Sequence, residues 1–181
     1  CADMARLPGV TAAAQTATHC RVSITLRPSA DSEIKSEVWL PTAAGWNGKF
    51  LMEGGGGFVG SVNTGGMTNA VREGYASAST DTGHTGASGS FALGHPEKIV
   101  DFAFRAVHET AVKAKALIAA YYGRGPRLSY WEGCSTGGRQ GLMSAQRYPE
   151  DFDGIIAGAP ANNQIHLCAW RLRLLMTALK S

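Results

Sequence analysis

The chain has 181 residues, of which 44% are hydrophobic and 17% are charged, and its net charge is +3. This length suits one domain, and the composition is that of a folded globular protein rather than a disordered one. Its apolar runs fall short of the roughly 18 residues that a membrane-spanning helix needs, and its positive charges are scattered. The sequence therefore predicts neither a membrane nor a nucleic-acid partner.

Two segments of alternating apolar and polar residues, 20–27 and 34–40, flank a turn and predict an antiparallel hairpin. From residue 50 onward, short apolar segments alternate with segments of helical spacing. Strands are expected over 50–53, 75–80, 128–132 and 154–159, and helices over 67–73, 97–122, 139–148 and 163–179. This order predicts one α/β domain over residues 1–181, with a mostly parallel sheet and flanking helices behind the hairpin.

The predicted strand 128–132 leads directly into Gly-Cys-Ser-Thr-Gly at residues 133–137, and a helix follows. This fits the pattern G-x-S-x-G, in which the serine lies on a strained strand-to-helix turn and small neighbours let the backbone pass. Such a turn exposes the hydroxyl of Ser135 and places the N–H of Thr136 at the helix N-terminus, where it can stabilise an oxyanion. Ser135 is therefore the candidate nucleophile.

The glycine cluster at residues 54–57 has two interpretations. The glycines that match the dinucleotide-binding pattern G-x-G-x-x-G are Gly55, Gly57 and Gly60. Asp81 ends the next strand, where a ribose-binding acid would stand. The alternative is a hydrolase loop that supplies the second N–H of an oxyanion hole. We favour the hydrolase because it explains Ser135 and the glycines together, whereas residues 61–66 make a poor start for a phosphate-binding helix.

An activated serine needs a base within hydrogen-bond reach, and the chain has five histidines. His84 lies in the loop after Asp81, near the edge where parallel strands end, and we take it as the first candidate. His166 is the second, because it alone follows Ser135 in the chain. The alternative is that Asp81 and His84 only brace their loop. No C-x-x-C or H-E-x-x-H motif occurs, so no metal or cofactor is expected.

These motifs resemble the tannase and feruloyl esterase family, which also includes terephthalate monoester hydrolases. The matching segments are GCSTGGRQG at 133–141, YP at 148–149, FDG at 152–154, GGGGF with a further glycine at 54–60, STDTGH at 79–84, and GAPAN at 158–162. The resemblance covers nearly all of the chain. It implies a secreted or periplasmic α/β-hydrolase that cleaves carboxylic esters of aromatic acids, of the feruloyl or galloyl type.

Position by position, Ser135 matches the family's nucleophile and Thr136 matches one oxyanion donor. The loop at 54–57 matches the other donor, and within it we favour Gly56 or Gly57.

Counting alone leaves open whether the four cysteines are bridged or free. The resemblance favours a disulfide between Cys1 and Cys20, which match an N-terminal family bridge. Cys134 matches a cysteine that the family bridges to one beside its catalytic histidine, and Cys168 has no counterpart.

In the family, a lid domain with most substrate contacts and a calcium site follows the strand at 154–159, and the catalytic Asp and His come after it. The chain ends before these segments, so the resemblance implies a C-terminally truncated hydrolase. Three hypotheses follow: an esterase that forms an acyl-enzyme at Ser135, a non-catalytic fragment or module that binds aromatic esters, and a dinucleotide-binding domain. Unpaired sheet edges would favour a homodimer.

Overall fold

The computed structural model describes residues 1–58 and 60–179. The strands are β1 (Val10–Gln15), β2 (His19–Leu26), β3 (Ile34–Pro41), β4 (Lys49–Glu53), β5 (Ala76–Thr80), β6 (Leu128–Cys134) and β7 (Gly154–Gly158). The helices are α1 (Thr64–Arg72), α2 (Pro96–Val100), α3 (Ala106–Tyr122), α4 (Thr136–Arg147) and α5 (Gln164–Ala178). Short 3₁₀ turns lie at Ala2–Arg6 and Gly89–Ala92, and a π-helical turn at Asp101–Arg105 joins α2 to α3.

All of these strands form one sheet in the order β1-β2-β3-β5-β4-β6-β7. The pairs along β1, β2, β3 and β5 are antiparallel, and those along β5, β4, β6 and β7 are parallel. The predicted hairpin is confirmed, because β2 and β3 pair from His19 with Pro41 to Leu26 with Ile34. In the parallel half, Glu53 pairs in register with Glu132, so the carboxyl ends of β4 and β6 meet at one edge.

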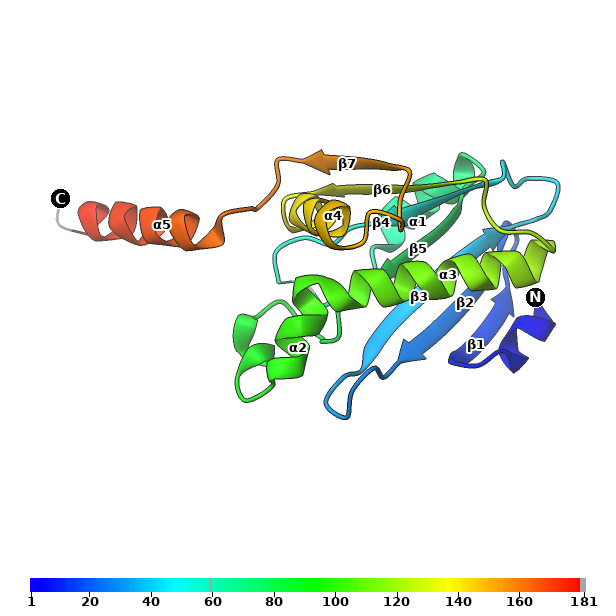
Figure 1. Cartoon of the computed structure of the whole chain (residues 1–181), viewed down its shortest axis with the longest axis horizontal. Coiled ribbons are helices and arrows are strands. Elements are labelled where there is room, and N and C mark those ends of the chain that lie inside the picture. The colour runs from blue at the N-terminus through cyan, green and yellow to red at the C-terminus, as the bar shows by residue number, and fades with distance from the viewer. Residues whose placement is uncertain (59, 180–181) are drawn as a thin grey trace.

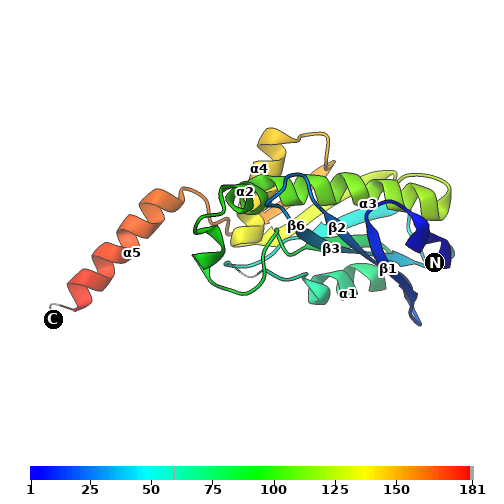
Figure 2. The ribbon, with the colours of Figure 1, turned by 90° about the horizontal axis from the view of Figure 1, so that it is seen from below.

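Helices cover both faces of the sheet. Figure 2 shows α3 and α4 on one face and α1 on the other. Helix α4 packs on β6 and β7, and α3 packs on β3 and β5. Helix α5 extends away from the sheet after β7 (Figure 1), and its side chains remain largely exposed.

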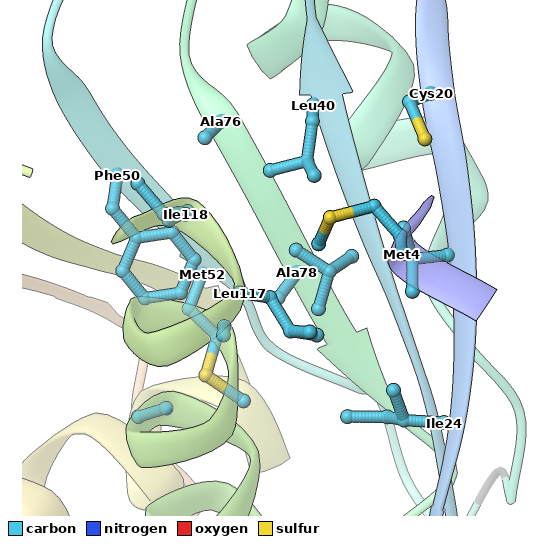
Figure 3. Packing of buried hydrophobic residues seen from close by; sticks show 14 of the residues in the cluster. Met4, Cys20, Ile24, Leu40, Phe50, Met52, Ala76, Ala78, Leu117 and Ile118 are labelled. Atoms are coloured by element: carbon cyan, nitrogen blue, oxygen red, sulfur yellow. The ribbon is translucent and has the colours of Figure 1, made fainter. Parts of the chain in front are cut away.

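The hydrophobic core fills the space between the sheet and α3 (Figure 3). Phe50 and Met52 from β4 and Leu117 and Ile118 from α3 are at most 1% exposed. Each such side chain stabilises the fold by about 1.5–3 kcal/mol on burial. Strand β5 lies between α3 and α1 and consists of small residues, which allows helices to approach both of its faces.

Several local features differ from the sequence expectations, and among them helix α1 begins at Thr64 rather than at 67. Strand β1 was not expected, because its three consecutive alanines carry little β-propensity and it is held by pairing with β2. The expected helix at 97–122 is divided by the π-helical turn. In this turn the buried carboxylate of Asp101 accepts hydrogen bonds from Ser32 and Arg105. Helix α4 begins at Thr136 rather than at 139, because packing overrides the low helix propensity of its glycines.

Candidate active site

Ser135 occupies the turn between β6 and α4 with a left-handed backbone, φ 59° and ψ −115°. A positive φ at a non-glycine residue costs roughly 1–3 kcal/mol and persists only where the surroundings hold it. Two hydrogen bonds do so here: the N–H of Ser135 donates to Gly158 at 3.0 Å, and the N–H of Ala161 donates to the Ser135 carbonyl at 2.9 Å. The predicted strained turn is present, and it leaves the Ser135 side chain exposed.

The glycines around Ser135 are required by close backbone contacts. A Cβ at Gly133 would lie 2.6 Å from the carbonyl carbon of Gly137, and a Cβ at Gly138 would lie 2.5 Å from the oxygen of Gly158. No side chain fits at these separations. The spacing of the motif therefore follows from the packing of α4 against the ends of β6 and β7.

The glycine loop, residues 54–57, lies against this turn. A Cβ at Gly54 would lie 2.7 Å from the Cα of Gly137, which shows how closely the two backbones pass. The Thr136 hydroxyl donates to the carbonyl of Gly57 at 3.0 Å, and the amide oxygen of Gln140 accepts from the N–H of Gly55 at 3.1 Å. The structure thus brings Ser135, Thr136 and the predicted oxyanion loop together.

Thr136 is the first residue of α4, so its N–H lies among the four that have no acceptor within the helix. The positive end of the helix dipole lies at the same place and favours a developing negative charge. Both features fit its predicted role as an oxyanion donor.

A cavity of about 540 Å³ opens beside the glycine loop and the end of β6. The buried carboxyl of Glu53 lines it, and burial together with the nearby Glu132 carboxylate raises the pKa of Glu53 to about 7. Asn63, at the N-terminus of α1, also lines this cavity and donates from its side-chain amide to the carbonyl of Gly54 at 3.1 Å.

His84 is buried, and both of its ring nitrogens have hydrogen-bond partners. Nε2 lies 2.8 Å from the carbonyl oxygen of Phe58, and a carbonyl only accepts, so Nε2 carries the proton. Nδ1 lies 3.3 Å from the hydroxyl of Thr82, and the ring stacks on Phe91 with centroids 3.8 Å apart. These contacts brace the loop, and the role of His84 as the base stays a prediction.

Asp81 has the same local function. Its Oδ1 accepts from the N–H of Lys35 at 3.0 Å and from that of Gly83 at 2.8 Å, and burial raises its pKa to about 6. His166 is exposed on α5. Among residues 1–58 and 60–179, the structure brings no histidine into a hydrogen bond with the hydroxyl of Ser135.

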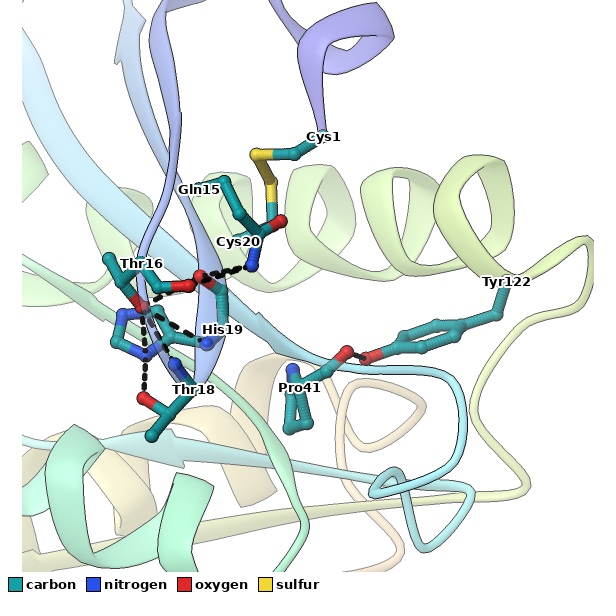
Figure 4. Close-up of a disulfide and its surroundings, with 8 residues drawn as sticks. All are labelled: Cys1, Gln15, Thr16, Thr18, His19, Cys20, Pro41 and Tyr122. Atoms are coloured by element: carbon teal, nitrogen blue, oxygen red, sulfur yellow. Dashed lines mark hydrogen bonds between the residues drawn. A yellow bond between two sulfur atoms is a disulfide. The ribbon is translucent and has the colours of Figure 1, made fainter.

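The cysteines divide into one bridge and two free thiols. Cys1 and Cys20 form a disulfide with their Cα atoms 5.5 Å apart, which ties the N-terminal turn to β2 (Figure 4). Closing a loop of this size stabilises a fold by about 3 kcal/mol. Cys134, next to the candidate nucleophile, and Cys168 are free and exposed.

The α1 N-terminus is poorly suited to the dinucleotide alternative. A phosphate there needs free N–H groups and positive potential, but the N–H of Gly66 donates to the Asn63 side chain at 3.0 Å. The Glu53 carboxyl occupies the space beside Gly66 as well. Asp81, the expected ribose ligand, is instead bonded to backbone N–H groups.

The described part of the chain contains no cluster of three or more metal-ligating side chains. No helix in that part is long and apolar enough to cross a membrane.

Sequence reasoning overlooked two side chains that hold the glycine loop, Gln140 and Asn63. The sequence feature that could have identified Gln140 is its position four residues after Thr136, because this spacing places both side chains on one face of a helix. For Asn63 it was the position just before a helix, which favours asparagine as a cap.

Comparisons with known proteins agree with this geometry. The sequence profile described as "Tannase and feruloyl esterase" matches residues 20–180. A probable feruloyl esterase B-1 of Aspergillus fumigatus is 46% identical over 156 residues, which are 86% of this chain and 29% of that protein. An uncharacterised esterase of Xanthomonas campestris pv. campestris is 48% identical over 149 residues, 81% of this chain and 26% of that protein.

Among solved structures, feruloyl esterase B from Aspergillus oryzae has a TM-score of 0.81 at 43% identity, covering 84% of this chain and 30% of that one. The chain thus spans less than a third of the length of these relatives. Its strand order, its strand-to-helix turn at Ser135 and its flanking helices are those of an α/β-hydrolase fold. Because the profile match extends over the hairpin, the glycine loop and the Ser135 turn, the chain belongs to the tannase and feruloyl esterase family.

Proposed function

We propose that this chain carries the nucleophile and oxyanion hole of a serine carboxylic ester hydrolase. One observation carries the proposal: Ser135 is held at φ 59° on a strand-to-helix turn with its side chain exposed. Stored strain of this kind is typical of nucleophiles that must project from a sheet edge.

The chemistry follows from these groups. The Ser135 hydroxyl oxygen attacks the ester carbonyl carbon, while its proton passes to a base and the carbonyl oxygen becomes an oxyanion. The N–H of Thr136 and an N–H of the glycine loop, from Gly56 or Gly57, stabilise that charge. The carbon–oxygen bond to the alcohol then breaks, the alcohol leaves with a proton, and water hydrolyses the acyl-enzyme.

The proposed substrates are esters of aromatic acids of the feruloyl or galloyl type. The names of the relatives support this choice. A secreted or periplasmic location is proposed with it, because the Cys1–Cys20 disulfide persists in an oxidising compartment.

The second candidate function is a module that binds aromatic esters without turnover. It is favoured by one specific observation: in the described residues the hydroxyl of Ser135 has no side-chain partner that could accept its proton. Titration with ferulate and gallate distinguishes the two, since binding without Ser135-dependent turnover favours the module.

Hydrolysis of p-nitrophenyl acetate and methyl ferulate by the wild type, Ser135→Ala and Ser90→Ala tests the esterase. Ser90 is exposed on the 3₁₀ turn Gly89–Ala92 and serves as the matched control. We expect the wild type and Ser90→Ala to exceed Ser135→Ala by about 10²-fold or more, because Ser135→Ala removes the nucleophile and leaves only the oxyanion donors. Equal rates for all three would overturn the proposal.

Two further variants in the same assay locate the base. A loss of about 10²-fold confined to His84→Ala or to His166→Ala, in a folded variant, identifies that residue. Unchanged rates in both mean that neither histidine accepts the proton of Ser135.

A further inference from the structure

Hydrogen bonds hold each end of the glycine loop at residues 54–57. At its start, the N–H of Gly54 donates to the carbonyl of Glu132 at 2.8 Å, and Asn63 donates to the carbonyl of Gly54. At its end, the Thr136 hydroxyl donates to the carbonyl of Gly57. Between them, the N–H of Gly55 donates to Gln140 at 3.1 Å.

The N–H groups of the loop differ in whether they are already hydrogen-bonded. Those of Gly54 and Gly55 are committed to acceptors, which removes both from the oxyanion hole. Within residues 1–58 and 60–179, the N–H groups of Gly56 and Gly57 have no acceptor, and both residues are exposed. The two free donors follow immediately after the residue that Gln140 holds.

Gln140 reaches the loop from the helix that begins at the nucleophile turn. It lies one helical turn after Thr136 on the same face of α4, and it is only 2% exposed. The two side chains bind the loop at Gly55 and Gly57, on either side of Gly56. Helix α4 therefore supplies one oxyanion donor through its first N–H and fixes the loop that supplies the other.

We propose that Gln140 is a positioning residue, which holds the loop through Gly55 so that the N–H of Gly56 or Gly57 and that of Thr136 converge on one oxyanion. The inference rests on the proposed esterase function. Gln140 touches no reacting atom, and it acts through the backbone of Gly55. Loop N–H groups that are positioned in this way stabilise the transition state more than the bound substrate, because the negative charge on the oxygen develops only as the transition state forms.

Gln140→Met keeps the side-chain length and removes the acceptor, whereas Gln140→Glu keeps an acceptor for the N–H of Gly55. Gln146→Met makes the same chemical change at an exposed position of α4 and is the matched control. With p-nitrophenyl acetate, we expect Gln140→Met to lower kcat about 10–100-fold with KM nearly unchanged. We expect Gln146→Met to stay within a few-fold of the wild type, and Gln140→Glu to keep a higher kcat than Gln140→Met because it retains an acceptor for the N–H of Gly55.

Amide hydrogen exchange gives a readout that does not depend on turnover. We expect the amide of Gly55, which donates to Gln140, to exchange at least about 10-fold faster in Gln140→Met, while those of β4 and α3 keep their protection. An unchanged kcat or unchanged loop exchange in a folded Gln140→Met variant overturns the inference. If Gln140→Met lowers the protection of the whole sheet equally, the role is structural and the inference is likewise overturned.

The two proposals fail in different ways. Equal turnover by wild type and Ser135→Ala removes the esterase function and this inference with it. Ser135-dependent turnover that Gln140→Met leaves intact removes only the positioning role.

Discussion

Single residues beside the candidate site combine burial with charge. Glu53 and Asp81 are both less than 10% exposed, and burial raises their pKa values to about 7 and about 6. A raised carboxyl pKa means that the folded state holds a proton more tightly than the unfolded chain. The stability from this proton is fully present below the ordinary pKa, and it is lost as the pH rises through the raised value.

Glu53→Gln tests this linkage, because an amide keeps the shape of the protonated carboxyl without its charge at high pH. We expect the free energy of unfolding of the variant, relative to wild type, to rise between pH 5 and pH 8 by about 2 kcal/mol. Urea unfolding at several pH values measures it. Glu73→Gln, at an exposed carboxyl, is the control, and a difference that is constant with pH would contradict the prediction.

Helix α4 illustrates how one element joins several parts of the site. It begins at the turn that carries Ser135, holds the glycine loop through Thr136 and Gln140, and packs on β6 and β7 through glycines on its inner face. Gly141 is one of these, and a Cβ there would lie 2.7 Å from the indole ring of Trp131. These glycines lower the intrinsic stability of the helix, but their lack of a side chain lets α4 pack closely on the sheet.

Gly141→Ala is expected to reverse the usual effect of this substitution in a helix. Alanine normally stabilises a helix by about 1 kcal/mol relative to glycine, but here the methyl group meets Trp131 and Ile155. We expect a loss of about 1–3 kcal/mol, typical of overpacking. Thermal or urea unfolding measures it, with Gly65→Ala on α1 as the control, because a Cβ there would meet only the Asn63 side-chain oxygen at 3.8 Å. Equal stability of both variants would contradict the packing argument.

At the scale of the whole molecule, the sheet ends in two edge strands, β1 and β7. On β7, Ile156 is 64% exposed, and α5 presents further exposed apolar residues. Edge strands and exposed apolar surface favour association between chains. The homodimer predicted from the unpaired sheet edges stays a prediction, and β7 is its strongest candidate surface.

Sedimentation velocity over a range of concentrations tests this prediction. We expect a concentration-dependent dimer that Ile156→Lys weakens by at least about 10-fold in Kd, since lysine on an edge strand opposes pairing. Leu175→Lys on α5 is the comparison variant, because Leu175 is exposed to a similar degree. Loss of the dimer in Leu175→Lys alone would assign the contact to the helix instead, and a monomer at all concentrations would exclude both.

The sequence by itself determined the hairpin, the parallel half of the sheet and the turn at Ser135. These depend on local patterns, namely alternation, helical spacing and glycines at fixed distances from a serine, and local patterns persist in any fold that uses them. Strand β1 and the start of α4 were not determined in this way, because pairing and packing override their weak propensities.

Only the tertiary structure decided which groups act together. The bond from Gly55 to Gln140 joins residues 85 positions apart, and that from Thr136 to Gly57 joins residues 79 apart. No local pattern specifies such a pair, since it depends on how β4 and β6 align in the sheet. The pairing of β4 with β5 likewise brings His84 to the carbonyl of Phe58, and that of β4 with β6 brings the carboxyl of Glu53 near that of Glu132. The roles of these side chains therefore follow from contacts that the fold creates.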